Sequence, residues 1–214
     1  DKFSNLNKVI AKELSEGQVV GWFQDRMEFG PRALGNRSIL ADARDPKMRD
    51  YINKKIKHRE MFRPFAPAIL EEKSNDYFDL NYSPFMLQVS KTKKSKKIPS
   101  AIHVDGTARV QTVNKNQNNE FYNLIEAFYK ITNVPVILNT SFNDAGEPLV
   151  ESPLDALICF LKTRLDYLVI DNIIISKKKL TNISTKLKKL ENIRNKFIEK
   201  NEKQIIKKLT KNFS

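Results

Sequence analysis

The segment of residues 120–138 constrains the fold more than any other part of the sequence. Residues 120–131 have the apolar spacing of an amphipathic helix. A short β-branched run, VPVIL at 134–138, follows directly and is typical of a strand buried on both faces. With 214 residues, of which 40% are hydrophobic, the chain is long enough for one α/β domain with a real core. We therefore expect an α/β domain of ordinary size.

The rest of the chain alternates between the same two patterns, with no internal repeat. We expect helices at residues 8–16, 46–57, 153–162 and 185–211, and strands at 18–23, 38–40, 85–89, 108–113 and 166–175, the last as one or two strands. Two prolines predict an extended or irregular segment at 63–70. Lys and Ser predict a mobile loop at 91–100, and polar residues predict a turn at 139–146. These patterns divide the chain into a domain at 1–176 and a basic helical tail at 177–214.

The net charge of +13 is concentrated in the tail. Residues 177–214 contain thirteen Lys or Arg and three Glu, which leaves only about +3 for the remaining body, where residues 91–97 form a second basic cluster. The tail helix places several apolar side chains on one face, so contact with RNA, an anionic membrane surface or a partner helix are open alternatives. We favour a helix packed on its own domain, because no aromatic residues are interleaved on its basic face for stacking on bases. We therefore do not expect nucleic acid as a partner.

Apolar runs such as 134–138 are far too short to cross a bilayer, so no membrane association is expected. Cys159 is the only cysteine, which excludes an intrachain disulfide framework and suits a reducing, cytoplasmic compartment. It lies in an apolar run, and we interpret it as a small buried hydrophobe. His58 and His103 are the only histidines, and we do not expect either to be catalytic or to bind a metal.

Residues 26–38, RMEFGPRALGNRS, hold Arg26, Arg32 and Arg37 in a loop that glycine and proline interrupt. Guanidinium groups bind phosphate bidentately and stay charged. Three arginines this close repel one another unless an anion or carboxylates compensate them. The sequence leaves two interpretations open, which are an anion site and a loop neutralised internally by Asp25 and Glu28.

Residues 57–67, KHREMFRPFAP, place Lys57, Arg59 and Arg63 beside aromatic and other apolar residues. Cations next to apolar walls suit a partly dry anion site, where charge–charge contacts are stronger than in water. The alternative is a charged surface turn with a hydrophobic anchor. Arg109, in DGTARVQTV, adds one more candidate phosphate ligand.

Residues 139–147, NTSFNDAGE, follow the buried strand, and loops at the carboxyl ends of strands are where α/β folds bind ligands. Asn139, Thr140, Ser141 and Asn143 offer hydroxyl and amide groups that can hold phosphate or sugar oxygens. The alternative is ordinary turn chemistry, which uses the same residue types.

Four strings together carry a resemblance: EFGPRALGNRSIL, REMFRPFAPAILEE, DGTARVQTV and NTSFNDAGEPLVESPLDAL. They resemble the C-terminal domain of the carbamoyltransferases, which include nodulation-factor and antibiotic O-carbamoyltransferases. The match spans about residues 18–176, and the tail lies outside it. The resemblance implies a YrdC-like fold, an open twisted α/β sheet with flanking helices. It implies that this domain binds carbamoyl phosphate and ATP and forms carbamoyl adenylate. It also implies a separate N-terminal domain of the actin-like ATPase superfamily, which transfers the carbamoyl group to a hydroxyl acceptor.

The resemblance also assigns roles to residues. It implies Arg32, Lys57 and Arg63 as catalytic cations of the carbamoyl phosphate pocket, with Arg59 as a further ligand. The spacing of Lys57 and Arg59 is similar to the Lys-x-Arg of YrdC proteins. Asp25 stands where the family usually has Gly; it adds an anion, and Asp tolerates left-handed backbone better than most residues. The implied nucleotide-binding residues are Arg109, Asn139, Thr140, Ser141 and Asn143, the last two similar to the Ser-x-Asn of YrdC proteins.

We therefore expect ATP as a substrate that brings Mg²⁺ with it, with catalysis by positioning and charge and with no metal ligand named by the sequence. The chain begins at Asp1 without Met, and we expect it to be half of an enzyme, with the acceptor recognised elsewhere. Two alternatives stay open. One is a YrdC-type threonylcarbamoyl-adenylate synthase acting in tRNA modification, and the other is a non-enzymatic RNA-binding module driven by the tail.

Overall fold

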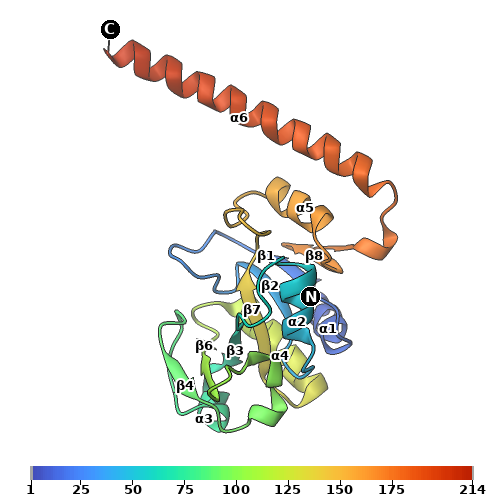
Figure 1. The fold of residues 1–214 in the computed structure, drawn as a ribbon, viewed down its shortest axis with the longest axis vertical. Coiled ribbons are helices and arrows are strands. Elements are labelled where there is room, and N and C mark those ends of the chain that lie inside the picture. The colour runs from blue at the N-terminus through green and yellow to red at the C-terminus, as the bar shows by residue number, and fades with distance from the viewer. Residues whose placement is uncertain (1, 214) are drawn as a thin grey trace.

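A computed structural model describes the backbone of residues 2–213 and the side chains of residues 5–201. Its centre is a seven-stranded mixed sheet with the strand order β6-β3-β7-β2-β1-β8-β9 (Figure 1). The strands are β1 (Val20–Phe23), β2 (Arg37–Asp42), β3 (Ala66–Leu70), β6 (Gln111–Val113), β7 (Val136–Ser141), β8 (Tyr167–Ile170) and β9 (Ile173–Ser176). A small second sheet pairs β4 (Val89–Lys91) with β5 (Thr107–Arg109). The expected α/β class is confirmed.

Helices cover both faces of the large sheet, because side chains alternate between the faces along each buried strand. One core packs α1 (Lys2–Ser15) and α4 (Asn119–Thr132) on strand residues such as Trp22 and Leu40. The other packs α2 (Met48–Lys55) and α5 (Pro153–Lys162) on residues such as Ile39 and Leu138. The remaining short helical elements are α3 (Ser74–Tyr77), η1 (Glu71–Lys73), η2 (Ser95–Lys97), η3 (Pro99–Ala101) and η4 (Lys177–Lys179).

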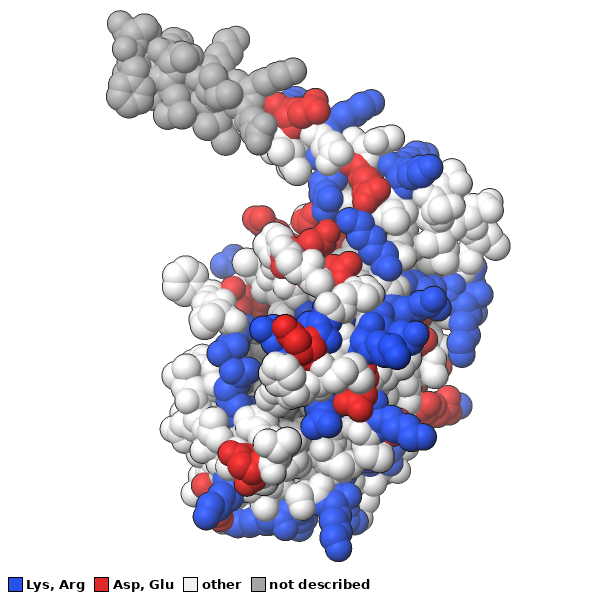
Figure 2. Space-filling view, in the orientation of Figure 1, with Lys and Arg blue, Asp and Glu red and all other residues white. Residues whose placement is uncertain are grey.

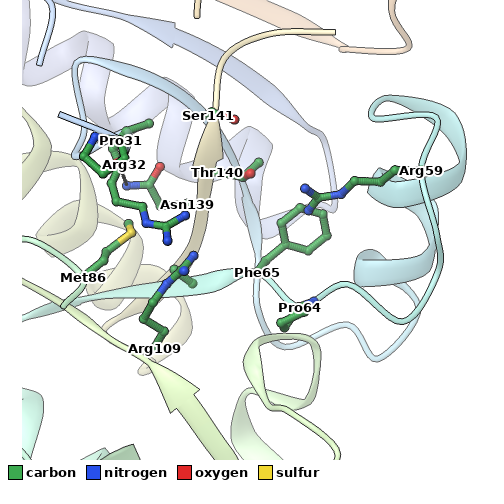
Figure 3. A pocket seen from close by; sticks show the side chains of 12 residues that line it. Pro31, Arg32, Arg59, Pro64, Phe65, Met86, Arg109, Asn139, Thr140 and Ser141 are labelled. Atoms are coloured by element: carbon green, nitrogen blue, oxygen red, sulfur yellow. Dashed lines mark hydrogen bonds between the residues drawn. The ribbon is translucent and has the colours of Figure 1, made fainter. Parts of the chain in front are cut away.

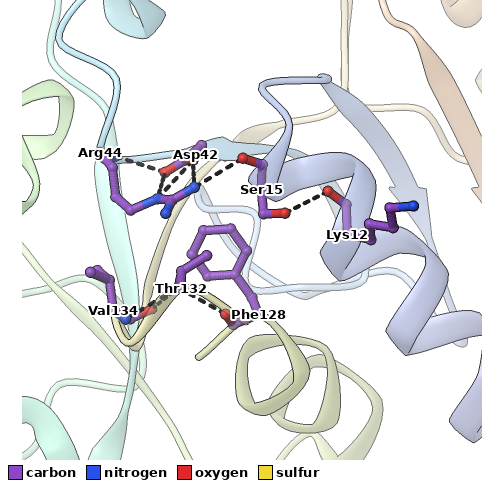
Figure 4. Close-up of polar contacts among 7 residues, drawn as sticks. All are labelled: Lys12, Ser15, Asp42, Arg44, Phe128, Thr132 and Val134. Carbon is purple, nitrogen blue, oxygen red and sulfur yellow. Dashed lines mark hydrogen bonds and ion pairs between the residues drawn. The ribbon is translucent and has the colours of Figure 1, made fainter. Parts of the chain in front are cut away.

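Arg44, which follows β2, contacts both α1 and α4, the two helices of the first core (Figure 4). Its guanidinium pairs with Asp42 at 2.6 Å and donates to the carbonyl of Ser15 at 3.0 Å. It also lies over the Phe128 ring, 5.4 Å from the centroid. A cation at the carbonyl end of α1 satisfies an orphan acceptor and complements the helix dipole. This contact fixes α1 and α4 relative to the central strands.

Three local expectations were wrong or incomplete. Only Val89 of the predicted 85–89 strand is in β4; Met86 has a φ of +54°, which breaks the extended backbone. The Lys-rich segment 91–100 contains the 3₁₀ turn η2 and the start of η3, and Ile98 and Ser100 are buried, so it is anchored on the core. The predicted turn at 139–146 starts late because β7 continues to Ser141. Apolar alternation makes a strand only where another strand offers hydrogen bonds to it.

The tail forms α6 (Ile183–Phe213), and its first turns pack on α5. Leu187 and Leu190 contact the second core, and Arg194 lies 3.9 Å from Asp155. Beyond these turns the helix extends away from the body (Figure 1), and Phe197 is 63% exposed. The expected packing on its own domain therefore holds for the first turns only. None of the described helices combines the length and apolarity that a membrane crossing needs.

Candidate functional site

A cavity of about 110 Å³ lies where the carboxyl end of β7 meets the start of β3 (Figure 3). The register pairs Ala66 with Asn139 at this point. The lining residues are Pro31, Arg32, Ala33, Arg59, Pro64, Phe65, Ala66, Met86, Arg109, Asn139, Thr140 and Ser141. The volume is below the roughly 300–1,000 Å³ of typical small-molecule sites. The enclosed part therefore suits a group of phosphate size, and the rest of a larger ligand would lie outside it.

Three arginines from three separate segments line this cavity. Within the described residues, no carboxylate lies within ion-pairing distance of Arg32, Arg59 or Arg109. Figure 3 shows Arg32 and Arg109 pointing into the same space, while Arg59 lies on the Phe65 ring at 4.8 Å. Burial and the charge of Arg32 lower the pKa of Arg109, and its buried Nε has no hydrogen-bond partner. Such a group is stabilised by an anion.

Glu28 builds the loop that carries Arg32. Its Oε1 accepts hydrogen bonds from the backbone N–H groups of Leu34 at 2.8 Å, Asn36 at 2.7 Å and Arg37 at 3.1 Å. The carboxylate is therefore used to hold the backbone, and no ion pair joins it to Arg32 among the described side chains. Internal neutralisation therefore does not reach Arg32 among the described side chains, whereas the charges of Glu28 and Asp25 oppose the lowering of the Arg37 pKa by burial.

Arg37 has a structural role in the same loop. Its guanidinium lies 3.5 Å from the centroid of the Phe23 ring and donates to the carbonyls of Gln24 at 2.6 Å, Asn36 at 3.1 Å and Asp25 at 2.9 Å. Asp25 has a φ of +45°, in agreement with the expectation that Asp tolerates this conformation. The Nη1 and Nη2 donors of Arg37 are therefore used to hold the loop between β1 and β2.

Two buried amides attach this loop to the sheet. Asn139 Nδ2 donates to the carbonyl of Ala33 at 3.1 Å and to Gln111 Oε1 at 2.7 Å. Gln111 Nε2 in turn donates to the carbonyl of Leu34 at 2.8 Å. Asn139, which lines the cavity, is only 1% exposed, and its Oδ1 has no hydrogen-bond partner in the described part of the chain. Sequence reasoning missed Gln111; its only signal was a polar side chain in the short strand of the DGTARVQTV motif.

Lys57 lies behind the cavity. Its ammonium donates to the Ser141 carbonyl at 2.6 Å, Ser141 Oγ at 3.2 Å, the Asn143 carbonyl at 3.0 Å and Asn143 Oδ1. Burial, aided by the charge of Arg59, lowers the pKa of Lys57 to about 7. All four acceptors are neutral, so the charge of Lys57 is held without an ion pair. Lys57 therefore fixes the backbone that follows β7.

Most of the residues singled out from the sequence are brought together. Six of them line the cavity: Arg32, Arg59, Arg109, Asn139, Thr140 and Ser141. Lys57 and Asn143 lie next to Ser141. Arg63 does not line the cavity; its side chain is 52% exposed and pairs with Glu60 at 3.1 Å. The convergence expected for Arg32, Lys57 and Arg63 is therefore incomplete.

The other polar candidates lie away from the cavity lining. His58 Nδ1 contacts Asp144 at 3.1 Å, and His103 contacts Thr107 at 3.0 Å. Cys159 is buried, and burial raises the pKa of its thiol to about 12. No group of three or more metal-binding side chains occurs in the part of the chain with described side chains. The cavity presents guanidinium and amide donors, which do not fit Mg²⁺ held by the protein itself.

Comparisons of sequence identify relatives of this chain. The family described as Carbamoyltransferase C-terminus matches residues 11–177. Nodulation protein NolNO of Sinorhizobium fredii is 50% identical over 78% of this chain and 26% of its own length. Nodulation protein NolO of Bradyrhizobium diazoefficiens is 48% identical over 77% of this chain and 31% of its own length. The chain thus spans about a quarter to a third of the length of these relatives.

Comparisons of structure show the fold. Sua5 of P. abyssi, solved in complex with L-threonine, superposes with a TM-score of 0.57 at 16% identity, covering 78% of this chain and 47% of its own. Full-length HypF, solved in a phosphate- and nucleotide-bound form, superposes with a TM-score of 0.52 at 19% identity, covering 78% and 25%. The expected YrdC-like α/β architecture is confirmed by this likeness.

Proposed function

The chain belongs to the carbamoyltransferase family, whose C-terminal domain it carries, and on this basis we propose that it binds carbamoyl phosphate and ATP and forms carbamoyl adenylate. The observation that carries the proposal is the set of three arginines, Arg32, Arg59 and Arg109, gathered around a phosphate-sized cavity with no acidic partner among the side chains that the structure describes. Both substrates are polyanions, and their reaction brings phosphate groups together. Fixed cations offset that repulsion.

Atom balance defines the reaction that this site must support. Water first cleaves carbamoyl phosphate, which releases phosphate and leaves carbamate. A carbamate oxygen then attacks the α-phosphorus of ATP, the bond from that phosphorus to the β,γ-bridge breaks, and pyrophosphate leaves. One phosphate and one pyrophosphate are therefore released for each carbamoyl adenylate. Negative charge accumulates on both leaving groups, and this is where guanidinium donors lower the barrier.

The side chains divide into ligands and supports. Arg32, Arg59 and Arg109 bind phosphate oxygens, and the buried Oδ1 of Asn139 accepts a hydrogen bond from the carbamoyl amino group. Lys57 acts through the backbone of Ser141, whose hydroxyl would exchange its contact with Asn143 Oδ1 for one with the nucleotide. Arg63 remains a proposed ligand only at the mouth, because it would have to leave Glu60. ATP would bring any Mg²⁺ with it, and no step is assigned to the metal.

The complete reaction extends beyond this chain. Since the relatives are three to four times longer than the matched part, we propose that transfer to a hydroxyl acceptor requires their other domain, of the actin-like ATPase superfamily. Carbamoyl adenylate is a mixed anhydride, which hydrolyses in water. The protein would work in the cytoplasm, where carbamoyl phosphate and ATP are available.

The test is ATP–pyrophosphate exchange by the purified chain, with and without carbamoyl phosphate. We expect exchange that depends on carbamoyl phosphate and no carbamoylation of sugars or aminoglycosides by this chain alone. Lys57→Ala should lose about 2–4 kcal/mol of transition-state stabilisation, because Lys57 fixes the Ser141 backbone. Arg164→Ala, a change of the same charge at an exposed position outside the cavity lining, should retain full exchange. Exchange at the same rate without carbamoyl phosphate would refute the proposal.

Two further arms separate the alternatives. A threonylcarbamoyl-adenylate synthase would show exchange with threonine and bicarbonate in place of carbamoyl phosphate. An RNA-binding module would bind RNA with a steep salt dependence that disappears when residues 177–214 are removed.

A further inference from the structure

A series of polar contacts runs from the tail helix to the wall of the arginine cavity. It begins at Glu191 of α6, whose Oε1 lies 3.2 Å from the ammonium of Lys162 on α5. The same ammonium donates to Glu147 Oε1 at 3.2 Å. Glu147 belongs to the β7–α5 loop, residues 142–152, and its carbonyl accepts a hydrogen bond from Asn143 Nδ2 at 2.7 Å. Three contacts therefore join α6 to Asn143, which stands two residues beyond Ser141 in the cavity lining.

Asn143 is where this series meets the site. Its Oδ1 accepts hydrogen bonds from Ser141 Oγ at 2.9 Å and from the Lys57 ammonium. A nucleotide that takes the Ser141 hydroxyl leaves the Asn143 amide with two contacts, Lys57 on one side and the Glu147 carbonyl on the other. An amide held at both ends keeps one orientation, so a displacement of Glu147 frees Asn143 and loosens the Lys57 ammonium as well.

Lys162 is shared by two carboxylates from different elements. Burial alone would lower the pKa of Lys162, but its hydrogen bonds to Glu147 and Glu191 raise that pKa, so the side chain is a cation at neutral pH. A single exposed ion pair contributes little, because solvent screens it. Here one cation serves both carboxylates, and its removal would also leave two like charges as neighbours. The loss of Lys162 is therefore larger than the loss of either pair alone.

α6 supplies a fixed end for these contacts. Its first turns pack on α5, and Leu187 and Leu190 contact the second core. Arg194 lies 3.9 Å from Asp155, which forms the capping box of α5 with Ser152 at the end of the β7–α5 loop. Figure 1 shows α5 between the large sheet and α6, while the charged surface in Figure 2 continues from the body onto the first turns of the tail. The family match ends before α6 begins, so the contacts of α6 with the loop are an addition to the matched domain.

We propose that Lys162 is a positioning residue that couples α6 to the β7–α5 loop, so that the tail helps to set the affinity of the site for ATP. The inference rests on the proposed function for the identity of the ligand. Lys162 is not among the residues that line the cavity, and it acts through Glu147 and Asn143. Its loss should therefore change the affinity for ATP and leave the reaction of bound ATP almost unaltered, because Lys162 touches no reacting group.

The first measurement is the KM for ATP and the kcat of ATP–pyrophosphate exchange in the presence of carbamoyl phosphate. Lys162→Met should raise the KM about three- to tenfold, and Glu191→Gln about two- to fivefold, with kcat within about twofold of the unmodified chain. Lys162→Arg keeps a cation between the carboxylates and should leave the KM unchanged. The double variant Lys162→Met with Glu191→Gln should not exceed Lys162→Met, because both changes break one network.

Lys188→Met and Glu199→Gln are the matched controls, since they make the same changes at exposed positions of α6. Both should keep the KM of the unmodified chain. An unchanged KM in Lys162→Met, or an equal rise in its control, would overturn the inference. So would a fall in kcat without a change in KM, which would assign Lys162 to the chemical step.

The second measurement is hydrogen–deuterium exchange of the backbone in residues 142–152, which does not depend on the reaction. We expect deuterium uptake of this loop to be faster by about threefold or more in Lys162→Met and Glu191→Gln than in the two control variants. Equal uptake would overturn the coupling. If the unmodified chain shows no ATP–pyrophosphate exchange, the proposed function fails, and the deuterium uptake of the loop alone then decides whether α6 and the loop are coupled.

Discussion

Arg109→Met provides the sharpest test of the arginine cavity, because its two expected effects have opposite signs. Arg109 is half-buried, its Nε is shielded from water without a partner, and Arg32 faces it across the cavity. Methionine keeps much of the aliphatic stem and removes the charge. The free protein should therefore gain stability while losing affinity for anions.

The magnitudes follow from these contacts. A buried donor without a partner destabilises the folded protein by about 1–3 kcal/mol, and Arg109→Met removes that cost. The substitution also loses some packing, so the free energy of unfolding should rise by about 1 kcal/mol in total. A charge-assisted hydrogen bond to phosphate contributes roughly 1.5–3 kcal/mol. Its loss should weaken pyrophosphate binding by about 10- to 150-fold. Arg37→Met supplies the contrast, because Arg37 uses its donors on three carbonyls and stacks on Phe23. In that variant the free energy of unfolding should fall by about 3 kcal/mol or more.

The stability of each variant is measured by urea unfolding, with the slope checked for constancy. Binding of pyrophosphate is measured by titration calorimetry at one fixed ionic strength, since exposed charges are screened by salt. Arg164→Met serves as the control for loss of one positive charge and should bind pyrophosphate like the unmodified chain. If Arg109→Met is destabilised by about 2 kcal/mol or more and binds pyrophosphate normally, Arg109 is a structural residue and the reasoning fails.

Three further predictions concern the supports of the cavity. A methyl group at Gly35, where φ is +111°, would lie 2.3 Å from the Phe121 ring, so Gly35→Ala should lower the free energy of unfolding by about 2–4 kcal/mol in urea; a loss under about 1 kcal/mol would contradict the packing. Gln111→Leu should lower the free energy of unfolding by about 2–3 kcal/mol in the same assay, because it removes the acceptor of Asn139 Nδ2 and the donor to the Leu34 carbonyl. Gln111→Glu keeps the acceptor but buries a carboxylate against that carbonyl, so it should cost at least as much. Burial lowers the pKa of Lys57 to about 7, and a bound anion raises it, so binding takes up a proton and affinity falls with rising pH. Sulfate, whose charge is constant, should therefore bind more weakly at pH about 9 than at about 7, with a smaller change in Lys57→Met.

The sequence predicted the elements best where local pattern and tertiary pairing agree. The buried run before Asn139 and the helix ahead of it are found as β7 and α4. The prediction failed at residues 85–89, where apolar alternation exists but only three residues, Val89–Lys91, find a partner strand. The side chains of Phe85, Leu87 and Val89 are exposed, so apolar alternation by itself does not identify a buried strand.

The candidate site shows the same division. Residue types alone left an anion site and ordinary loop chemistry open, and the resemblance of four motifs to a known family decided for phosphate binding. The motifs could not separate Arg32 from Arg37, which differ only in what surrounds them. They also placed Arg63 beside the cavity, although Glu60 holds it outside. Gln111 gave no signal strong enough to be noticed.

The sequence by itself therefore determined the family, the order of helices and strands, and the excess of cations in the motifs. Only the tertiary structure decided which cations share a cavity, because that depends on pairing between distant segments. Ala66 lies beside Asn139 through the pairing of β3 with β7, and β2 pairs with β7 on its other side. Contacts across such separations depend on the closure of the whole sheet. The closure of the sheet also decides how deeply each cation is buried and whether a carboxylate lies beside it. These two factors set how strongly each cation attracts an anion.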